Sequence, residues 1–218
     1  MIPVLDAGAL AAAVALVCGY YAYLRWQVRK HNPHYTVHAV NTIARERWVE
    51  TVMASGRMDI LAVQTLRNSV MAASFMASTA ILLIIGVLTL SGAERSGELW
   101  HSLNFGTTDL RLTTLKLLLL LVDFFFAFFC FSMAVRFFNH VGYMINVPVT
   151  VGLEALAPGR VADYLNRAGT YYTLGMRAFF ICVPLVFWFF GSHFMLAATV
   201  ALIAALHRLD RAPKKDTS

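Results

Sequence analysis

The chain carries little charge for its size. Of its 218 residues, 14% are charged and 59% are hydrophobic. Soluble domains contain about 25% charged residues, because their surfaces face water. The composition therefore excludes an ordinary soluble domain and predicts a surface that largely faces lipid. A single bundle of helices, covering residues 1–218 as one membrane domain, is the simplest organisation.

Cysteine and catalytic motifs are also scarce. The three cysteines, Cys18, Cys130 and Cys182, lie in apolar runs without CxxC spacing, which is typical of small buried hydrophobic residues rather than disulfides. The sequence contains no GxSxG, no HExxH and no glycine-rich phosphate loop. We therefore predict a protein that is not an enzyme and that has no cofactor.

Lysine and arginine are absent before the first apolar run, whereas Arg25, Arg29 and Lys30 follow it. A cleavable signal peptide has the opposite polarity. Because positive loops favour the cytoplasmic side, we expect an uncleaved first helix with its N-terminus outside. The expected location is the bacterial inner (plasma) membrane.

Four apolar runs are long enough to cross a bilayer, which takes about 20 residues. They cover approximately residues 5–25, 62–90, 114–138 and 178–206, followed by a tail over 207–218. The last run contains Pro184 and Gly191-Ser192, so we expect one long, kinked helix there. The sequence thus predicts an all-α fold, a polytopic bundle of four transmembrane helices.

Two segments between the runs show helical spacing of apolar residues. Residues 37–55 indicate an amphipathic helix at the cytoplasmic interface, with Gly56 placed to end it and Asp59 to cap the next helix. Residues 160–168 indicate a short surface helix that ends at Gly169. Val141 to Ala157 contains Pro148 and is expected to be interfacial or re-entrant.

The charge of the tail conflicts with four spans. Four crossings from an outside N-terminus place Arg208 and Arg211 outside, against the positive-inside trend. A fifth span at Val141 to Ala157 would move the tail inside but would leave Arg160 and Arg177 outside. Because the first helices usually set the orientation, four spans is the prediction.

The basic residues favour lipid over nucleic acid as a partner. The net charge is +6, but the lysines and arginines occur in short stretches beside apolar runs rather than in one long patch. Such stretches suit anionic phospholipid headgroups. Ser69, Ala73 and Ala77 form a stripe of small residues four apart, which predicts association with further copies or with partner membrane proteins.

A set of polar residues is predicted to meet at the cytoplasmic face. Its members lie on the amphipathic helix or near the ends of spans, often at offsets of three and four that share a helical face. Converging guanidinium groups with amides would bind phosphate or carboxylate, whereas the alternative is that they only extend to headgroups and cap carbonyl oxygens. The set is Arg45, Gln64, Arg67, Asn68, Arg136, Asn139, His140 and Arg177.

Two weaker patterns involve ionisable residues. Asp123 lies within the third apolar run and Lys116 lies two helical turns earlier, so they mark either an ion or proton path or a structural pair. His31, His34 and His38 have a spacing that could bind metal, but their position beside Pro33 favours a polar linker and no metal site.

Three stretches carry a family resemblance: LAVQTLRNSVMAASFMAST at 61–79, AVRFFNH at 134–140, and GMRAFF followed by VPLVFWFFG at 175–191. From about Arg45 to Leu209 the chain resembles the family called domain of unknown function 599, found in bacteria and plants. The resemblance implies a helical integral membrane protein and implies no agreed activity, substrate or cofactor.

Two functions remain open at this point. The first is a membrane-organising or accessory protein that binds anionic lipid headgroups through the arginines of the cytoplasmic face. The second is a homo-oligomeric channel or transporter for a small anion or protons, with Asp123 in its path. The scarcity of polar residues in the first and last apolar runs favours the first.

Overall fold

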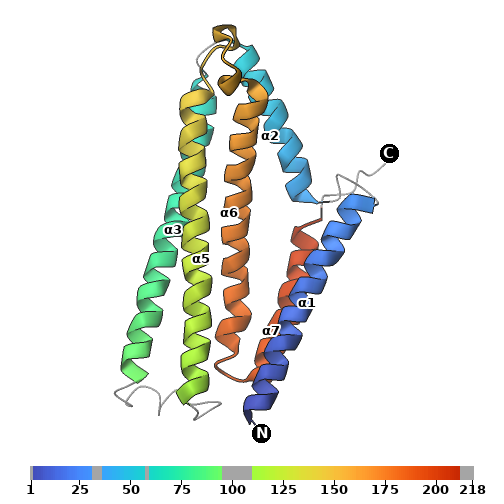
Figure 1. Cartoon of the computed structure of the whole chain (residues 1–218), viewed down its shortest axis with the longest axis vertical. Helices are drawn as coiled ribbons and strands as arrows, with labels where there is room; N and C mark the ends of the chain where they lie inside the picture. The colour runs from blue at the N-terminus through green and yellow to red at the C-terminus, as the bar shows by residue number, and fades with distance from the viewer. Residues whose placement is uncertain (1, 31–35, 57–58, 95–109, 212–218) are drawn as a thin grey trace. The chain divides into compact units, whose positions relative to one another are not determined.

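The computed structural model describes residues 2–30, 36–56, 59–94 and 110–211, and within these ranges the fold is all-α, as predicted (Figure 1). The elements are α1 (Ile2–Lys30), α2 (Val37–Ala54), α3 (Ile60–Glu94), α5 (Leu110–Met144), the short 3₁₀ turns η1 (Val149–Val151) and η2 (Glu154–Leu156), α6 (Pro158–Phe187) and α7 (Ser192–Leu209).

The start of α3 follows from the predicted cap. Oδ1 of Asp59 accepts hydrogen bonds from the backbone N–H groups of Leu61 (2.8 Å) and Ala62 (3.2 Å). Gly56, in a left-handed conformation with φ 61°, follows the end of α2. These bonds satisfy N–H groups that the first turn of a helix leaves without partners, so the capping prediction is confirmed.

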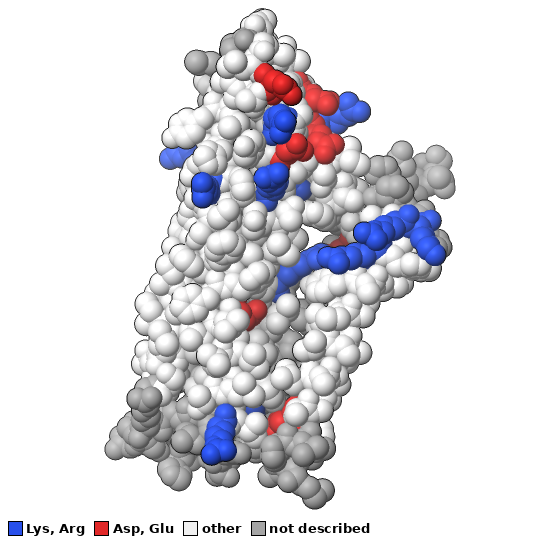
Figure 2. Space-filling model, viewed as in Figure 1, with Lys and Arg blue, Asp and Glu red and all other residues white. Residues whose placement is uncertain are grey.

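Within the described residues, five helices rather than four are long and apolar enough to cross a membrane. They comprise Asp6–Lys30, Ile60–Ser91, Arg111–Met144, Pro158–Phe187 and Ser192–Leu209. Most of the visible surface is uncharged, and the charged side chains gather in a few patches (Figure 2). The predicted count of four spans is therefore not confirmed, and the difference lies in the C-terminal half of the chain.

The predicted kinked helix over 178–206 is two helices in the structure. α6 ends at Phe187 and α7 begins at Ser192. Between them Gly191 has φ 140°, a conformation that side-chain-bearing residues rarely adopt. The glycine therefore breaks the run completely, whereas Pro184 lies inside α6 without ending it.

The predicted short helix over 160–168 is the first part of α6, which continues through Gly169. Gly169 serves close packing instead of termination, since a Cβ at this position would overlap the guanidinium group of Arg45 from α2. Residues 141–157 contain the end of α5 and the two 3₁₀ turns, which excludes a fifth span there. Whether these turns or α2 lie at a membrane interface stays a prediction.

The chain divides into two compact units. Unit 1 comprises Met1–Val40, Leu83–Phe124 and Phe179–Ser218, and unit 2 comprises Asn41–Leu82 and Phe125–Ala178. The core of unit 2 joins α2, α3, α5 and α6 through buried residues such as Val49, Leu66, Phe138 and Leu165. Ala73 of the predicted small-residue stripe is fully buried in this core, so that position already packs against helices of the same chain.

Unit 1 contains the paired helices α1 and α7, which lie side by side (Figure 1). Ala9 and Ala13 of α1 pack against Trp188 and Met195, and farther along α1 a second cluster includes Leu206. Small residues on α1 allow the two helices to approach closely, because a large side chain would hold the backbones apart.

Candidate functional site

The predicted polar residues on α3 lie on its outer face. Gln64, Arg67 and Asn68 are exposed, whereas Ala62 and Leu66 are buried in the core of unit 2. The period of 3.6 residues per turn separates the two groups, because residues three and four apart share one side of a helix. The shared face predicted from sequence is real, and it points away from the core of the unit.

The polar residues at the end of α5 behave in the same way. Arg136, Asn139 and His140 are exposed, and the buried residues of this segment belong to the apolar stripe that includes Phe138. The imidazole ring of His140 lies 6.3 Å from the ring of Tyr164 on α6, measured between centroids. α5 therefore also presents its polar residues outward from unit 2.

An enclosed anion pocket is not what these residues form. Among the described residues, the side chains of Gln64, Arg67, Asn68, Arg136 and Asn139 make no hydrogen bond or ion pair. An exposed guanidinium group without a protein partner keeps all five of its N–H donors available. Within the predicted set, Arg67 of α3 and Arg136 of α5 are therefore two exposed cationic positions of unit 2, which we together call the arginine surface.

The other two arginines of the predicted set are held within the protein. Arg45 is half-buried against Gly169, its Nε donates to the backbone oxygen of Asn41 (3.1 Å), and burial lowers the pKa of its guanidinium group from the usual value. Arg177 lies inside the candidate span Pro158–Phe187 rather than at the entry of a span, since α6 begins much earlier than predicted.

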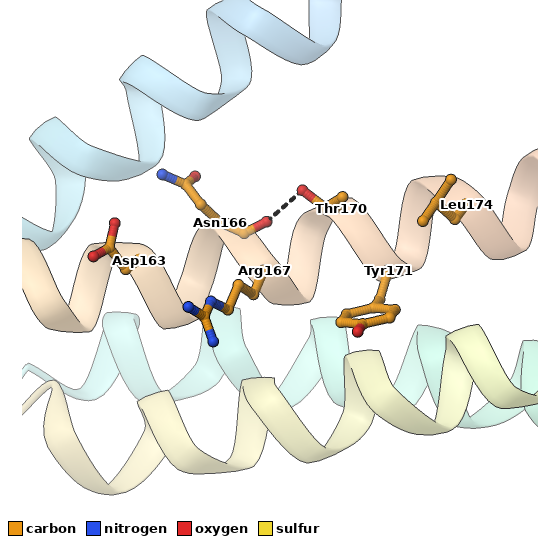
Figure 3. A pocket seen from close by; sticks show the side chains of 6 residues that line it. All are labelled: Asp163, Asn166, Arg167, Thr170, Tyr171 and Leu174. Atoms are coloured by element: carbon orange, nitrogen blue, oxygen red, sulfur yellow. Dashed lines mark hydrogen bonds between the residues drawn. The ribbon is translucent and has the colours of Figure 1, made fainter.

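A groove along α6, which sequence reasoning missed, lies in unit 2. It has a volume of about 490 Å³ and is lined by Asp163, Asn166, Arg167, Thr170, Tyr171 and Leu174 (Figure 3). These residues recur at offsets of three and four, so they occupy one face of the helix. The same spacing is visible in the sequence, but the prediction of a short helix at 160–168 was based on the apolar residues of the other face.

The groove is tied to α2 by a side-chain hydrogen bond. Nδ2 of Asn166 donates to Oε1 of Glu46 on α2 (3.1 Å), and the Asn166 Oδ1 atom is shielded from solvent without a partner among the described residues. The hydroxyl of Thr170 donates to the backbone oxygen of Asn166 (2.8 Å). Figure 3 shows Asn166 directed toward α2, whereas Arg167 and Tyr171 are directed away from α2.

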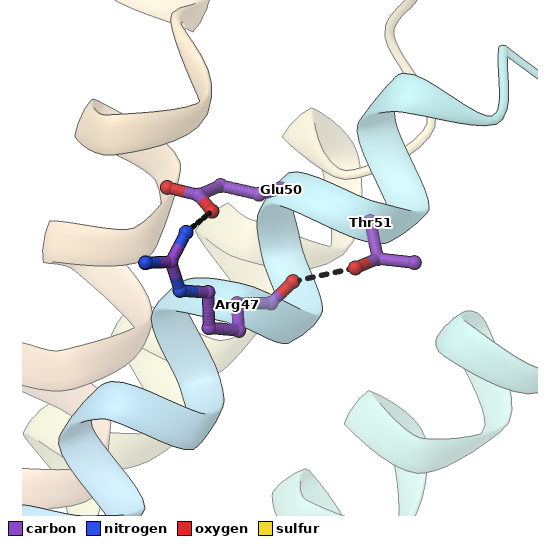
Figure 4. A network of polar contacts seen from close by, with 3 residues as sticks. All are labelled: Arg47, Glu50 and Thr51. Carbon is purple, nitrogen blue, oxygen red and sulfur yellow. Dashed lines mark hydrogen bonds and ion pairs between the residues drawn. The ribbon is translucent and has the colours of Figure 1, made fainter.

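Two exposed residues of α2 form an ion pair with each other. Nη1 of Arg47 lies 2.9 Å from Oε2 of Glu50, and the hydroxyl of Thr51 donates to the backbone oxygen of Arg47 (Figure 4). Both charged side chains are exposed, so the pair contributes little stability. Its relevance is that Arg47 already has a partner, in contrast to Arg67 and Arg136.

Unit 1 contains a buried polar cluster that surrounds the turn between α6 and α7. Asp6 and Lys116 are each only 3% exposed. Oδ1 of Asp6 accepts hydrogen bonds from Nε1 of Trp188 (2.8 Å) and from the hydroxyl of Ser192, and Nζ of Lys116 donates to the backbone oxygen of Trp188 (2.9 Å). Nζ also lies 5.1 Å from the centre of the Trp188 ring, within reach of a cation–π contact.

This cluster assigns Lys116 a different partner from the one that the sequence indicated. One of the two interpretations of the sequence was a structural pair with Asp123 on the same helix, but Lys116 bonds the backbone oxygen of Trp188, which directly follows α6 and also accepts a hydrogen bond from the Gly191 N–H (3.2 Å). Asp6, Trp188 and Ser192 were missed, because contacts between residues so far apart in sequence leave no local pattern. Asp123 is half-buried, and its Oδ2 atom has no hydrogen-bond partner among the described residues.

The histidine pattern is mostly outside the described residues, which include His38 of α2 but not His31 or His34. His38 makes an interaction within the protein. Among the described residues there is no group of three or more His, Cys, Asp or Glu side chains arranged to hold a metal ion.

Across the ranges that the structure describes, five helices are long and apolar enough to cross a membrane, which is consistent with a polytopic helical membrane protein. Residues 9–215 match the family described as protein of unknown function, DUF599, and the chain therefore belongs to that family, as the motifs in 61–79, 134–140 and 175–191 indicated. No curated protein and no solved structure matches the chain.

Proposed function

We propose that this protein is a non-enzymatic, membrane-organising or accessory protein that binds anionic phospholipid headgroups through its arginine surface. The observation that carries the proposal is that Arg67 and Arg136 are exposed and have no partner within the part of the protein that the structure describes, although both belong to helices that can span a membrane. An unpaired guanidinium group on such a helix is costly in hydrocarbon, so it needs a phosphate or water at its depth.

The positions of the two arginines along their helices support this proposal. At a rise of 1.5 Å per residue, Arg67 lies about 10 Å from the start of α3 and Arg136 about 12 Å from the end of α5. Both are thus within reach of an interface by extension of the side chain. Ile60 and Leu61, which precede Arg67, are strongly exposed and apolar, so lipid rather than bulk water suits the surrounding surface.

Five spans also support a topology in the inner membrane with the N-terminus outside. The crossings then place the ends of α1 and α5, the starts of α3 and α6, and the tail in the cytoplasm. The tail residues Arg208 and Arg211 and the first-turn residue Arg160 all become cytoplasmic, which satisfies the positive-inside trend that four spans violated. The arginine surface then faces the anionic inner leaflet.

Native mass spectrometry of the protein released from phosphatidylglycerol-containing membranes tests this function. We expect Arg67→Gln combined with Arg136→Gln to weaken phosphatidylglycerol retention at least tenfold, about the value of one charge-assisted hydrogen bond. Arg47→Gln is the matched control, because Arg47 is exposed but paired with Glu50. Unchanged retention in the double variant, or an equal loss in the control, would contradict the proposal.

A second candidate, a homo-oligomeric channel or transporter for protons or a small anion, is favoured by one observation. The Oδ2 atom of Asp123 is shielded from solvent and has no hydrogen-bond partner within the described ranges, on a helix that can span the membrane. Ionisable groups in such positions commonly mark ion or proton pathways. Proteoliposomes should then show a proton or anion flux that Asp123→Asn abolishes, and a flux no greater than that of empty liposomes would remove this candidate.

A further inference from the structure

The groove on α6 has two chemically different parts. Its first part carries the charged residues Asp163 and Arg167, and its second part ends with Tyr171 and Leu174 (Figure 3). Its volume of about 490 Å³ lies within the usual range of small-molecule sites, roughly 300–1,000 Å³. A ligand that fills it must therefore be amphipathic, with charge at one end and an apolar chain at the other.

The two charges at the groove are available for a ligand. Asp163 and Arg167 are exposed, and neither makes a hydrogen bond or ion pair among the described residues. Their spacing of four residues permits an ion pair on a helix, yet in Figure 3 the Arg167 side chain is directed away from α2 and forms no ion pair with Asp163. The two residues are separated by about 6 Å along the helix axis, so one ligand with two opposite charges can contact both.

The floor of the groove is fixed in place. Asn166 is held by Glu46, and Thr170 is held by the backbone oxygen of Asn166. The Tyr171 ring stacks on Phe137 of α5, with centroids 5.6 Å apart and an angle of 16° between the planes. A site whose walls are already ordered loses less conformational entropy on binding, which favours a specific ligand.

We propose that this groove binds one phospholipid whose headgroup contains both a phosphate and a primary ammonium group, as in phosphatidylethanolamine. The Arg167 guanidinium group binds the phosphate, the Asp163 carboxylate accepts hydrogen bonds from the ammonium group, and an acyl chain lies along Tyr171 and Leu174. The inference goes beyond the anionic-lipid function, because the ligand is zwitterionic and the site is separate from Arg67 and Arg136.

The charges of the groove discriminate among lipids. A purely anionic headgroup places negative charge beside Asp163 and has no cation to compensate it. A choline headgroup carries a positive charge but no N–H donors, so it cannot donate hydrogen bonds to the Asp163 carboxylate. A primary ammonium group has three N–H donors, and it is the headgroup that satisfies both charged residues.

The test is native mass spectrometry of the full chain from nanodiscs containing equal parts of phosphatidylethanolamine, phosphatidylcholine and phosphatidylglycerol. We expect wild type to retain one phosphatidylethanolamine in preference to phosphatidylcholine. Asp163→Asn should reduce that preference about tenfold, and Arg167→Gln should reduce retention of both lipids. Arg160→Gln is the matched control, because Arg160 is an exposed arginine of the same helix outside the groove, and it should bind as wild type does.

Several outcomes would overturn the inference. These are equal retention of the three lipids, an unchanged preference in Asp163→Asn, or a loss in Arg160→Gln as large as in Arg167→Gln. Soluble phosphoethanolamine added as a competitor separates the two sources of the headgroup: displacement of the lipid at equal concentration would contradict the role of the apolar part. Phosphatidylglycerol retention in the same spectra, read with Arg67→Gln and Arg136→Gln, reports on the proposed function independently.

Discussion

At the scale of single residues, glycines decide where the helices of unit 2 approach closely. A Cβ added to Gly175 on α6 would lie 2.8 Å from ring atoms of Phe131 on α5. Phe131 is fully buried, so its ring has no free space to move into. By contrast, Gly142 on α5 has no atom within 4 Å of the position that a Cβ would take.

Gly175→Ala should therefore lower the free energy of unfolding by about 1–3 kcal/mol, because overpacking forces side chains and backbone to shift. Gly142→Ala is the control and should be neutral or stabilising by up to about 1 kcal/mol, since alanine favours a helix. Thermal unfolding in detergent, followed by circular dichroism, measures both. Equal unfolding temperatures for the two variants would contradict the packing of α5 on α6 at this position.

At the scale of elements, the sequence predicted some boundaries well and others poorly. The start of α3 was predictable because Asp59 is a local capping signal. The length of α6 was not, because its first half carries charged residues such as Asp163 and Arg167 on the groove face and a hydropathy pattern cannot distinguish that from a surface helix. The sequence indicated an irregularity at Gly191, but the same residues are compatible with a kink in one helix and with a turn between two helices.

Local sequence patterns predicted the candidate sites only in part. Faces within one helix, such as that of Arg67 on α3, follow from the helical period and were predicted. The cluster of Asp6, Lys116 and Trp188 joins residues from distant parts of the chain, and no local pattern indicates it. Gly169 was taken as a helix end because a glycine that terminates a helix and a glycine that admits a neighbouring side chain look identical in sequence.

The polar cluster of unit 1 should stabilise the turn between α6 and α7. Asp6→Leu removes the acceptor for Trp188 Nε1 and leaves the buried charge of Lys116 without its nearby carboxylate, so we expect a loss of about 3 kcal/mol in the free energy of unfolding. Asp6→Asn keeps an acceptor oxygen and should cost less. The intrinsic fluorescence of tryptophan during denaturation is a suitable measure.

Asp163→Asn serves as the control for these variants, because Asp163 is exposed and makes no hydrogen bond or ion pair among the described residues. Its unfolding curve should overlay that of wild type. An Asp6→Leu protein as stable as the control would show that the cluster does not hold the turn.

At the scale of the whole molecule, the side of the membrane on which the basic tail lies depends on whether the number of crossings is odd or even. Five spans put the two termini on opposite sides, whereas the four predicted from sequence put them on the same side. The arginine surface, the α6 groove and the basic tail share the cytoplasmic side only in the first case. The fifth candidate span arises because α6 and α7 are separate helices, so the five-span topology depends on the turn at 188–191.

The location of the two termini tests the five-span topology most directly. Reporter fusions, alkaline phosphatase for the outer side and green fluorescent protein for the cytoplasm, should be placed at each end of the full chain in turn. We predict phosphatase activity from the N-terminal fusion and fluorescence from the C-terminal fusion. The same reporter active at both ends would mean an even number of crossings and would contradict the five-span topology, which places the basic tail on the same side as the proposed lipid-binding surface.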